Sequence, residues 1–267
     1  MSLIHSMSLF SHLYLDILQL VNAKNICEIG SETGGNTSVL LSYVKEHFGK
    51  LTCIDTNPDE NFYQSTIAEG DLVFLKGTSL DHILNIENID GWFVDGDHNW
   101  YTVYNELSLI RQSVLRDGGY FLAFVHDVDW PCAYRDLYYN PDRIPPAFRH
   151  PHRWDMGTTL DKAELVKGGF RGEGAFALAC HSGGERNGVR RAIEDFLAEN
   201  ADFPLCFSSV PGVFGLGIIF GEDEVNAPQI KRRLLHIVDN PLLAELERNR
   251  LLNYLRVIEL QDQATQS

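Results

Sequence analysis

The sequence predicts an α/β fold in which helices cover both faces of a mostly parallel sheet. Short apolar runs alternate with helical patterns through the first half of the chain. Strands that alternate with helices in this way are typical of βαβ units. Strands buried on both faces carry continuous apolar runs, as these do. Because crossovers between parallel strands are right-handed, few topologies remain.

The expected elements of the first half follow one another in order. Residues 1–24 are predicted to form an amphipathic helix that packs on the domain, because apolar side chains recur at helical spacing at Leu9, Leu13, Ile17 and Leu20. Helical patterns lie around residues 39–44 and 103–114. Five strands are expected at residues 25–30, 51–55, 72–77, 91–96 and 118–127.

The second half has a different pattern. Residues 128–188 are rich in proline, glycine, arginine and histidine and show little periodicity, and so long a stretch inside a domain is usually functional. A helix is then expected, with Asn187 as a candidate N-cap. The runs 203–210 and 214–220, joined by Pro211 and Gly212, predict an antiparallel hairpin. Residues 227–260 predict two helices separated at Pro241, so we expect residues 1–267 to form one domain.

Composition excludes several classes of partner. The formal net charge of −15 repels phosphate backbones and anionic lipid, so neither nucleic acid nor a membrane surface is expected to bind. No apolar run approaches the ~20 residues of a membrane span, and the N-terminus lacks the basic region and cleavage site of a secretory signal. The five cysteines are scattered, without a CxxC pair. These features predict a reduced, cytoplasmic protein.

A glycine turn follows the first predicted strand. Gly30 allows a sharp turn, and Gly34 and Gly35 allow close approach of a ligand or helix. The spacing is not GxGxxG, so the dinucleotide fingerprint is absent. The second strand ends at Asp55, where a carboxylate can accept hydrogen bonds from ribose hydroxyls. The alternatives are that Asp55 only forms the turn before Asn57 and that Glu28 is a solvated loop carboxylate.

Four segments in order, EIGSETGGNT, CIDTNP, KGTS and FVDGDHNWY, resemble the motifs of class I S-adenosylmethionine-dependent methyltransferases. The segments VDGDH and GGYFLAFVHD are similar to the branch that includes the macrocin O-methyltransferases, which act on small molecules. The resemblance covers about residues 20–130. It implies a Rossmann-like, doubly wound, seven-stranded sheet whose last strand is antiparallel. It also implies that residues 128–188 form an inserted substrate-binding cover between strands five and six.

The resemblance also implies roles for individual residues. Glu28 would face the methionine amino group or brace the turn, and Asp55 would hold the ribose. Thr78 and Ser79 would lie near the adenine, although relatives often have an acidic residue in place of Thr78. The full set expected to bind S-adenosylmethionine is Glu28, Gly30, Ser31, Gly34, Asp55, Thr78, Ser79 and Asp95.

Methyl transfer to a hydroxyl requires alignment of the reactants and removal of the hydroxyl proton, and a divalent cation such as Mg²⁺ can assist the second step. Neighbouring parallel strands could bring together the polar residues that follow strands four and five, which are Asp95, Asp97, His98, His126, Asp127 and Asp129. The resemblance implies metal binding by Asp95 and Asp127. His126 stands where relatives have an acidic ligand, and imidazole suits Zn²⁺, Mn²⁺ or Fe²⁺ better than Mg²⁺.

Asp97 occupies the position of the proposed general base in such relatives, and His98 is a competing base. The structural alternatives are that Asp97 and His98 cap the helix that begins near Tyr101, and that His126 and Asp127 form a hydrogen-bonded pair.

The segment 128–188 is also expected to contact the acceptor. Its arginines could bind an anionic acceptor such as a nucleotide-linked or acidic sugar, or they could pair with the surplus carboxylates; the candidates are Arg135, Arg143, Arg149 and Arg153. Apolar residues on more than one face of the C-terminal helices suggest a homodimer. Two other functions stay open: an iron-dependent hydroxylase-like enzyme that uses Asp95, His126 and Asp127, and a non-catalytic cofactor-binding or assembly subunit.

Overall fold

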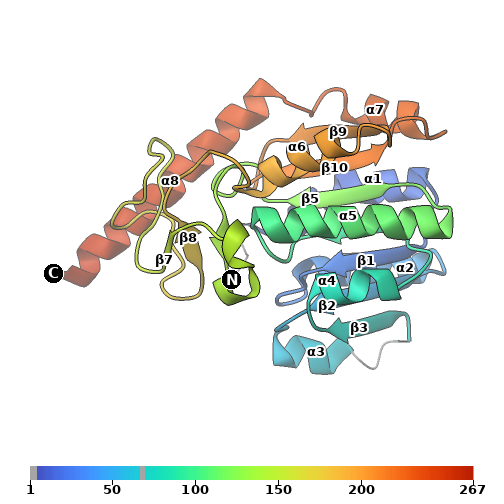
Figure 1. Ribbon diagram of the computed structural model, residues 1–267, viewed down its shortest axis with the longest axis horizontal. Helices are drawn as coiled ribbons and strands as arrows, with labels where there is room; N and C mark the ends of the chain where they lie inside the picture. Colours follow the sequence, from blue (N-terminus) through green and yellow to red (C-terminus); the bar gives the residue numbers. More distant parts are fainter. Residues whose placement is uncertain (1–4, 67–69, 267) are drawn as a thin grey trace.

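The protein is built on one seven-stranded sheet, as Figure 1 shows for the computed structural model, which describes residues 5–66 and 70–266. The strand order is β3-β2-β1-β4-β5-β10-β9. The five strands of the first half are parallel, and β10 runs antiparallel to both of its neighbours, as predicted. The strands are β1 (Asn25–Ile29), β2 (Lys50–Asp55), β3 (Leu72–Lys76), β4 (Gly91–Val94), β5 (Leu122–His126), β9 (Leu205–Val210) and β10 (Leu216–Gly221).

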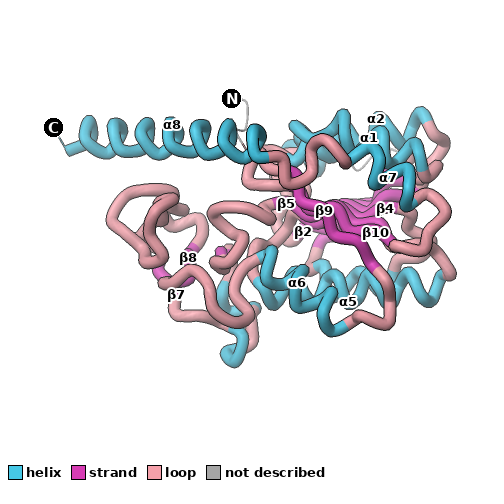
Figure 2. The backbone as a smooth tube through the Cα atoms, turned by 90° about the horizontal axis from the view of Figure 1, so that it is seen from above, coloured by secondary structure: helices cyan, strands magenta, loops and turns pink. Residues whose placement is uncertain are grey.

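Helices cover both faces of this sheet (Figure 2). One face carries α1 (Ser11–Leu20), α2 (Gly35–Glu46) and α7 (Ala227–Leu234), and the other carries α5 (Trp100–Asp117) and α6 (Val189–Glu199). The remaining short elements of the main body are the 3-10 turns Met7–Phe10 and Ile83–Asn85 and the helices α3 (Glu60–Thr66) and α4 (Ser79–His82). Within the described residues, no helix has the length and apolar composition that a membrane crossing requires.

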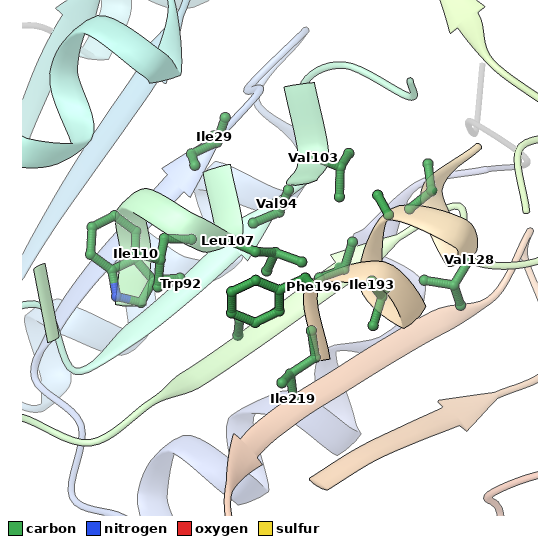
Figure 3. Close-up of a cluster of buried hydrophobic side chains, with 14 of the residues drawn as sticks. Ile29, Trp92, Val94, Val103, Leu107, Ile110, Val128, Ile193, Phe196 and Ile219 are labelled. Atoms are coloured by element: carbon green, nitrogen blue, oxygen red, sulfur yellow. The ribbon is translucent and has the colours of Figure 1, made fainter. Parts of the chain in front are cut away.

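Helix α5 illustrates how the sequence forms these elements. It begins after Asn99, whose side chain accepts a hydrogen bond from the backbone N–H of Thr102 at 2.9 Å, and it ends at Gly118, which has a φ of +68°. The buried stripe of Val103, Leu107 and Ile110 has the predicted helical spacing and packs between the sheet and α6. Figure 3 shows the ring of Phe196 of α6 next to Leu107 and Ile193, and all three belong to one cluster of buried side chains.

The predicted N-cap of α6 is wrong. Gly188 occupies the N-cap position, and the amide of Asn187 serves the preceding segment instead. Its Oδ1 accepts a hydrogen bond from the backbone N–H of Asp136 at 2.7 Å, and its Nδ2 donates to the carbonyls of His181 and Gly183. Asn187 is 2% exposed, so an amide that can both donate and accept is used to satisfy buried backbone groups.

The two ends of the chain follow the predicted pattern with shifted bounds. The predicted helix over residues 1–24 is a 3-10 turn followed by α1, its residues 1–4 lie outside the described part, and Leu9 is 55% exposed rather than packed. The two C-terminal helices are confirmed. Pro241 is the first residue of α8 (Pro241–Gln266), a position where proline is tolerated because its missing N–H would have no partner in the helix.

Residues 128–188 form a small second sheet that periodicity could not reveal. Its order is β6-β8-β7, with β6 (Leu137–Tyr138), β7 (His152–Arg153) and β8 (Ala177–Ala179), and all pairs are antiparallel. The 3-10 turns Pro141–Arg143 and Pro146–Phe148 lie between its strands. Strands of two or three residues are too short for a hydrophobic pattern. Arg135 is buried beneath this sheet, where its guanidinium donates to the carbonyls of Ala163 and Ala179.

Replacement of Phe196 tests the packing of α6 on the sheet. Phe196 is fully buried, so Phe196→Ala should lower the free energy of unfolding by about 3–5 kcal/mol, because it removes an aromatic ring and leaves a cavity. Val225 is 84% exposed, and Val225→Ala should change it by less than about 0.5 kcal/mol. Urea unfolding of the three proteins measures both effects. Equal midpoints for wild type and Phe196→Ala would contradict the packing described.

Candidate active site

A cavity of about 790 Å³ lies at the carboxyl ends of the parallel strands. It is bordered by residues at or just after the ends of β1, β2, β4 and β5, among them Gly30, Asp55, Asp95 and Asp127. The strand order reverses direction between β1 and β4, and the chains leaving these two strands diverge. Ligands of open parallel sheets bind at this kind of switch point.

The glycine turn after β1 passes directly against the segment after β4. Gly30 has a φ of +85°, and a Cβ added there would lie 2.2 Å from the carbonyl oxygen of Asp95. The Gly30 N–H donates to the carbonyl of Ile54 at 2.9 Å, and the Asp95 N–H donates to the carbonyl of Ile29 at 2.9 Å. Only glycine satisfies both the left-handed conformation and this approach, so the predicted role of Gly30 in the turn is confirmed.

The carboxylate of Asp55 clamps the same loop. One oxygen accepts hydrogen bonds from the N–H and hydroxyl of Ser31, at 2.8 and 2.9 Å, and from the N–H of Glu32 at 3.1 Å. The other oxygen accepts one hydrogen bond, from the N–H of Asn57 at 2.8 Å. Asp55 therefore forms the turn before Asn57, as one reading of the sequence expects. It also braces the glycine turn, which the sequence did not indicate, and lines the cavity with an oxygen that can accept a further bond.

Glu28 lies beneath this loop and is 1% exposed. It accepts hydrogen bonds from the Asn36 amide at 2.9 Å and from the Cys53 thiol at 3.4 Å, and burial raises its pKa to about 7. The reading of Glu28 as a solvated loop carboxylate is therefore wrong. Gly34 does not border the cavity; its neighbour Gly35 does, while a Cβ at Gly34 would meet the ring of Phe62 at 2.1 Å.

Thr78 and Ser79 border the cavity next to a buried acid that the sequence analysis did not identify. The Ser79 hydroxyl donates to Oε1 of Glu106 at 2.5 Å, whereas Oε2 has no hydrogen-bond partner among the described residues. Glu106 is fully buried, and burial raises its pKa to about 8, with a smaller contribution from the charge of Asp97. A glutamate within the apolar stripe of α5, beside Val103 and Leu107, is the sequence signal that could have revealed it.

Asp95, His98 and Asp127 form a group that we call the acidic-histidine cluster. One potential ligand atom from each lies within 4.8 Å of those of the other two. Nδ1 of His98 is 3.3 Å from a carboxylate oxygen of Asp127. Asp127 has a φ of +58°, a conformation that costs energy for a residue with a side chain and that often accompanies a functional site.

The cluster contains His98 where the sequence analysis named His126. Both ring nitrogens of His126 are engaged, since Nδ1 is 3.1 Å from an oxygen of Asp95 and Nε2 donates to the carbonyl of Val213 at 2.8 Å. Burial alone lowers the pKa of His126, but the charges of Asp95 and Asp127 raise it to about 9. In this arrangement His126 orients Asp95 and Asp127 and has no free ring nitrogen that could bind a cation.

Asp97 lines the cavity and does not cap α5, because Asn99 does. Its carboxylate accepts a hydrogen bond from the Thr102 hydroxyl at 3.3 Å. Burial raises its pKa, against the opposing effect of His98. Asp129 is outside this site: it forms an ion pair with Arg190 at 2.7 Å and does not border the cavity.

The inserted segment 128–188 forms part of the cavity wall, through Tyr139, Asn140, Arg143, Ile144 and Ala175. Of its four candidate arginines, Arg143 is the one that borders the cavity. Arg135 is committed to backbone carbonyls. Arg149 and Arg153 form ion pairs with Asp142 at 2.9 Å and Asp155 at 2.7 Å, which is the pairing with surplus carboxylates that the sequence analysis left open.

Glu106→Gln tests the buried acid. A carboxyl group whose pKa is raised from 4.5 to about 8 in the folded state contributes stability below pH 4.5 that is lost as the pH rises to 8. Glu106→Gln should therefore match wild type near pH 5 and become more stable than wild type towards pH 8, by up to roughly 1.4 kcal/mol for each pH unit. Exposed Glu46 on α2 provides the control Glu46→Gln. If the urea midpoints of Glu106→Gln and wild type changed in parallel with pH, the pKa would be ordinary.

Residues 27–128 match the family model described as a methyltransferase domain, and this range extends from β1 to just past β5. Comparison with curated proteins finds no significant match.

Several solved structures are similar in fold. An S-adenosylhomocysteine-bound methyltransferase of Podospora anserina, PaMTH1, is 14% identical with a TM-score of 0.47, over 82% of this chain and 80% of that one. An O-methyltransferase of Bacillus cereus has the same identity and TM-score over 81% of each chain. TomG of Streptomyces achromogenes, an O-methyltransferase of tomaymycin synthesis, is also 14% identical with a TM-score of 0.47, over 82% of each chain. At these values the likeness identifies neither a substrate nor a metal for this chain.

Proposed function

We propose that the protein is an S-adenosylmethionine-dependent methyltransferase that methylates a hydroxyl group of a small acceptor with the assistance of a divalent cation. The observation that carries the proposal is the junction of two features in one cavity. The glycine turn at Gly30 and the acidic-histidine cluster meet at Asp95, whose backbone contacts the turn and whose side chain belongs to the cluster. The match of residues 27–128 to a methyltransferase domain supports the same conclusion.

The cavity residues that lie at or after the ends of β1, β2 and β3, with Gly96 after β4, fit the cofactor. Gly30, Gly35 and Gly96 border it without side chains, which leaves room for close approach to the backbone. Asp55 has an oxygen that receives a single hydrogen bond and can accept another from a ribose hydroxyl. Thr78 and Ser79 also border the cavity, and the adenine would lie against them.

The acidic-histidine cluster fits a cation by the chemistry of its donors. Two carboxylates and one imidazole suit Mn²⁺, Fe²⁺ or Zn²⁺ better than Mg²⁺. Such an ion, held by Asp95, His98 and Asp127, would lower the pKa of an acceptor hydroxyl and orient it. His126 would set the orientation of Asp95 through its Nδ1, because histidine and carboxylate partners outside the ligand shell hold ligands in place.

Asp97 is then the group that takes the acceptor proton. His98 is committed to the cluster, and Asp97 lines the same cavity with a pKa raised by burial, so it is a stronger base than an exposed aspartate. As the oxygen–carbon bond forms, the bond from carbon to sulfur breaks, and the proton moves to Asp97. The products are the methyl ether and S-adenosylhomocysteine.

The acceptor end of the cavity is formed by the inserted segment. Tyr139 offers an aromatic face, and Arg143 offers a cation that also favours the ionised form of Asp97. These residues suit a planar or sugar-like acceptor with an anionic group. The arginine expected to bind that group is Arg143, because Arg149 and Arg153 are already paired.

Titration calorimetry with S-adenosylmethionine tests the cofactor site. Wild type should bind with micromolar affinity, and Asp55→Ala should lose binding by at least about tenfold, because the loop clamp and the ribose acceptor are both removed. Asp223→Ala removes an exposed acid away from the cavity and should bind like wild type. Thermal unfolding confirms that each variant is folded. Failure of folded wild type to bind would contradict the proposal and favour a non-catalytic role.

Titration with Mn²⁺, followed by electron paramagnetic resonance, tests the acidic-histidine cluster. His98→Ala should weaken binding by about tenfold or more, since even loss of a group outside the ligand shell costs that much. Exposed His236 provides the matched control, His236→Ala, which should bind like wild type. Equal affinity of wild type and His98→Ala would show that His98 is not a ligand.

A further inference from the structure

Helix α8 is anchored to the rest of the protein along one face. It leaves the end of the main sheet and runs past the inserted segment, with the C-terminus at its far end (Figures 1 and 2). Near its start Glu247 accepts a hydrogen bond from the N–H of Phe214 at 3.0 Å. Leu251 is 3% exposed, and Asp262 forms an ion pair with Arg171 at 2.6 Å. The opposite face of α8 therefore has a fixed orientation away from the body.

That outer face carries an apolar stripe. Leu242, Leu246, Val257 and Leu260 are 48–66% exposed. At 3.6 residues per turn they fall within roughly a quarter of the helix circumference. Exposed Asn249 and Asn253 lie in the same stripe, between the second and third apolar residues. No acidic residue lies in the stripe, although the chain has a net charge of −15.

Along the helix axis, the stripe is symmetric about the level of Leu251, which itself lies on the opposite, buried face. Leu242 and Leu260 lie nine residues before and after this point, and Asn249 and Asn253 lie two residues before and after it. Leu246 and Val257 are almost equally placed. A stripe that reads the same from both ends is complementary to itself when two helices run antiparallel about a twofold axis, which is the geometry of an isologous contact.

The charges beside the stripe select the same arrangement. Glu245 and Arg256 lie on one flank, almost equally far from Leu251 and on opposite sides of it. In an antiparallel pair each Glu245 faces the partner's Arg256, whereas in a parallel pair the two flanks that carry these residues would lie on opposite sides of the contact and could not pair. Leu252, 49% exposed on this flank next to the centre, would meet the partner's Leu252. The complementarity favours a second copy of this chain over an unrelated partner.

We propose that α8 pairs antiparallel with α8 of a second copy, through the stripe of Leu242, Leu246, Asn249, Asn253, Val257 and Leu260. The amides of Asn249 and the partner's Asn253 set the register, as buried asparagines do in coiled coils. Two pairs of Glu245 and the partner's Arg256 flank the apolar contact. The cavity at the main sheet stays outside the interface, so the pairing holds whether or not the proposed reaction is correct.

Sedimentation equilibrium of the full-length chain tests the stripe. Wild type should sediment with twice the 30.2 kDa mass of one chain at micromolar concentration. The double variant Leu246→Glu with Val257→Glu should sediment as a monomer, because it sets four carboxylates in the contact of a dimer. Val225→Glu, at an 84% exposed position in the turn between β10 and α7, should remain dimeric. A monomeric wild type, or a dimer unaffected by the double variant, would overturn the proposal.

A charge exchange tests the antiparallel orientation separately. Glu245→Arg sets two arginines against each other and should raise the dissociation constant about tenfold. Adding Arg256→Glu and Glu259→Arg to the same chain recreates the pair with opposite signs, keeps an ion pair of residue 256 with residue 259, and should restore the dissociation constant. Both chains keep the cavity residues, so their monomer fold is checked by thermal unfolding. If the added substitutions fail to rescue the first, the helices do not pair as proposed.

Discussion

The cavity exists because the backbone after β1 passes in contact with the backbone after β4. At Gly30 the chain adopts a left-handed conformation in which an added Cβ would lie only 2.2 Å from the carbonyl oxygen of Asp95, and from this point the two loops diverge. Divergence opens the space that Asp55 borders from one side and Asp127 from the other. Asp95 belongs to both parts, because its backbone closes the turn and its carboxylate enters the acidic-histidine cluster. A single close approach thus aligns the proposed cofactor site with the proposed cation site.

The second constraint is the buried negative charge of the acids at the end of the sheet, which the imidazole of His126 partly compensates. Asp95 and Asp127 approach each other at the end of the sheet, and the imidazole between them compensates part of their charge. His126 is itself held by the carbonyl of Val213, in the turn between β9 and β10. The next residue, Phe214, donates to Glu247 of α8, so the hairpin connects the floor of the cluster to the C-terminal helix. These hydrogen bonds explain why the antiparallel hairpin is part of the site as well as of the sheet.

Sequence patterns and local chemistry predicted the strands and helices of the main sheet, whereas tertiary contacts determine which residues form the site. The seven strands and the break near Pro241 are confirmed, because each depends on runs of apolar residues or on proline. The choice between His98 and His126 could not be made from the sequence, since it depends on which ring nitrogens the fold leaves free. The roles of Asn99 and Asn187 likewise depend on tertiary contacts. Asn99 caps α5, whereas Asn187 bonds buried backbone groups and caps no helix. The strands of residues 128–188 have only two or three residues and leave no periodic signal.

The most direct test of the account is a crystal structure grown with S-adenosylhomocysteine and Mn²⁺, with anomalous scattering recorded from the metal. The account predicts one cavity with two occupants. The amino-acid end of the cofactor should lie at the Gly30 turn and its ribose at Asp55, and an anomalous peak should lie among Asp95, His98 and Asp127. A cofactor bound elsewhere, or a metal on His126 in place of His98, would contradict it.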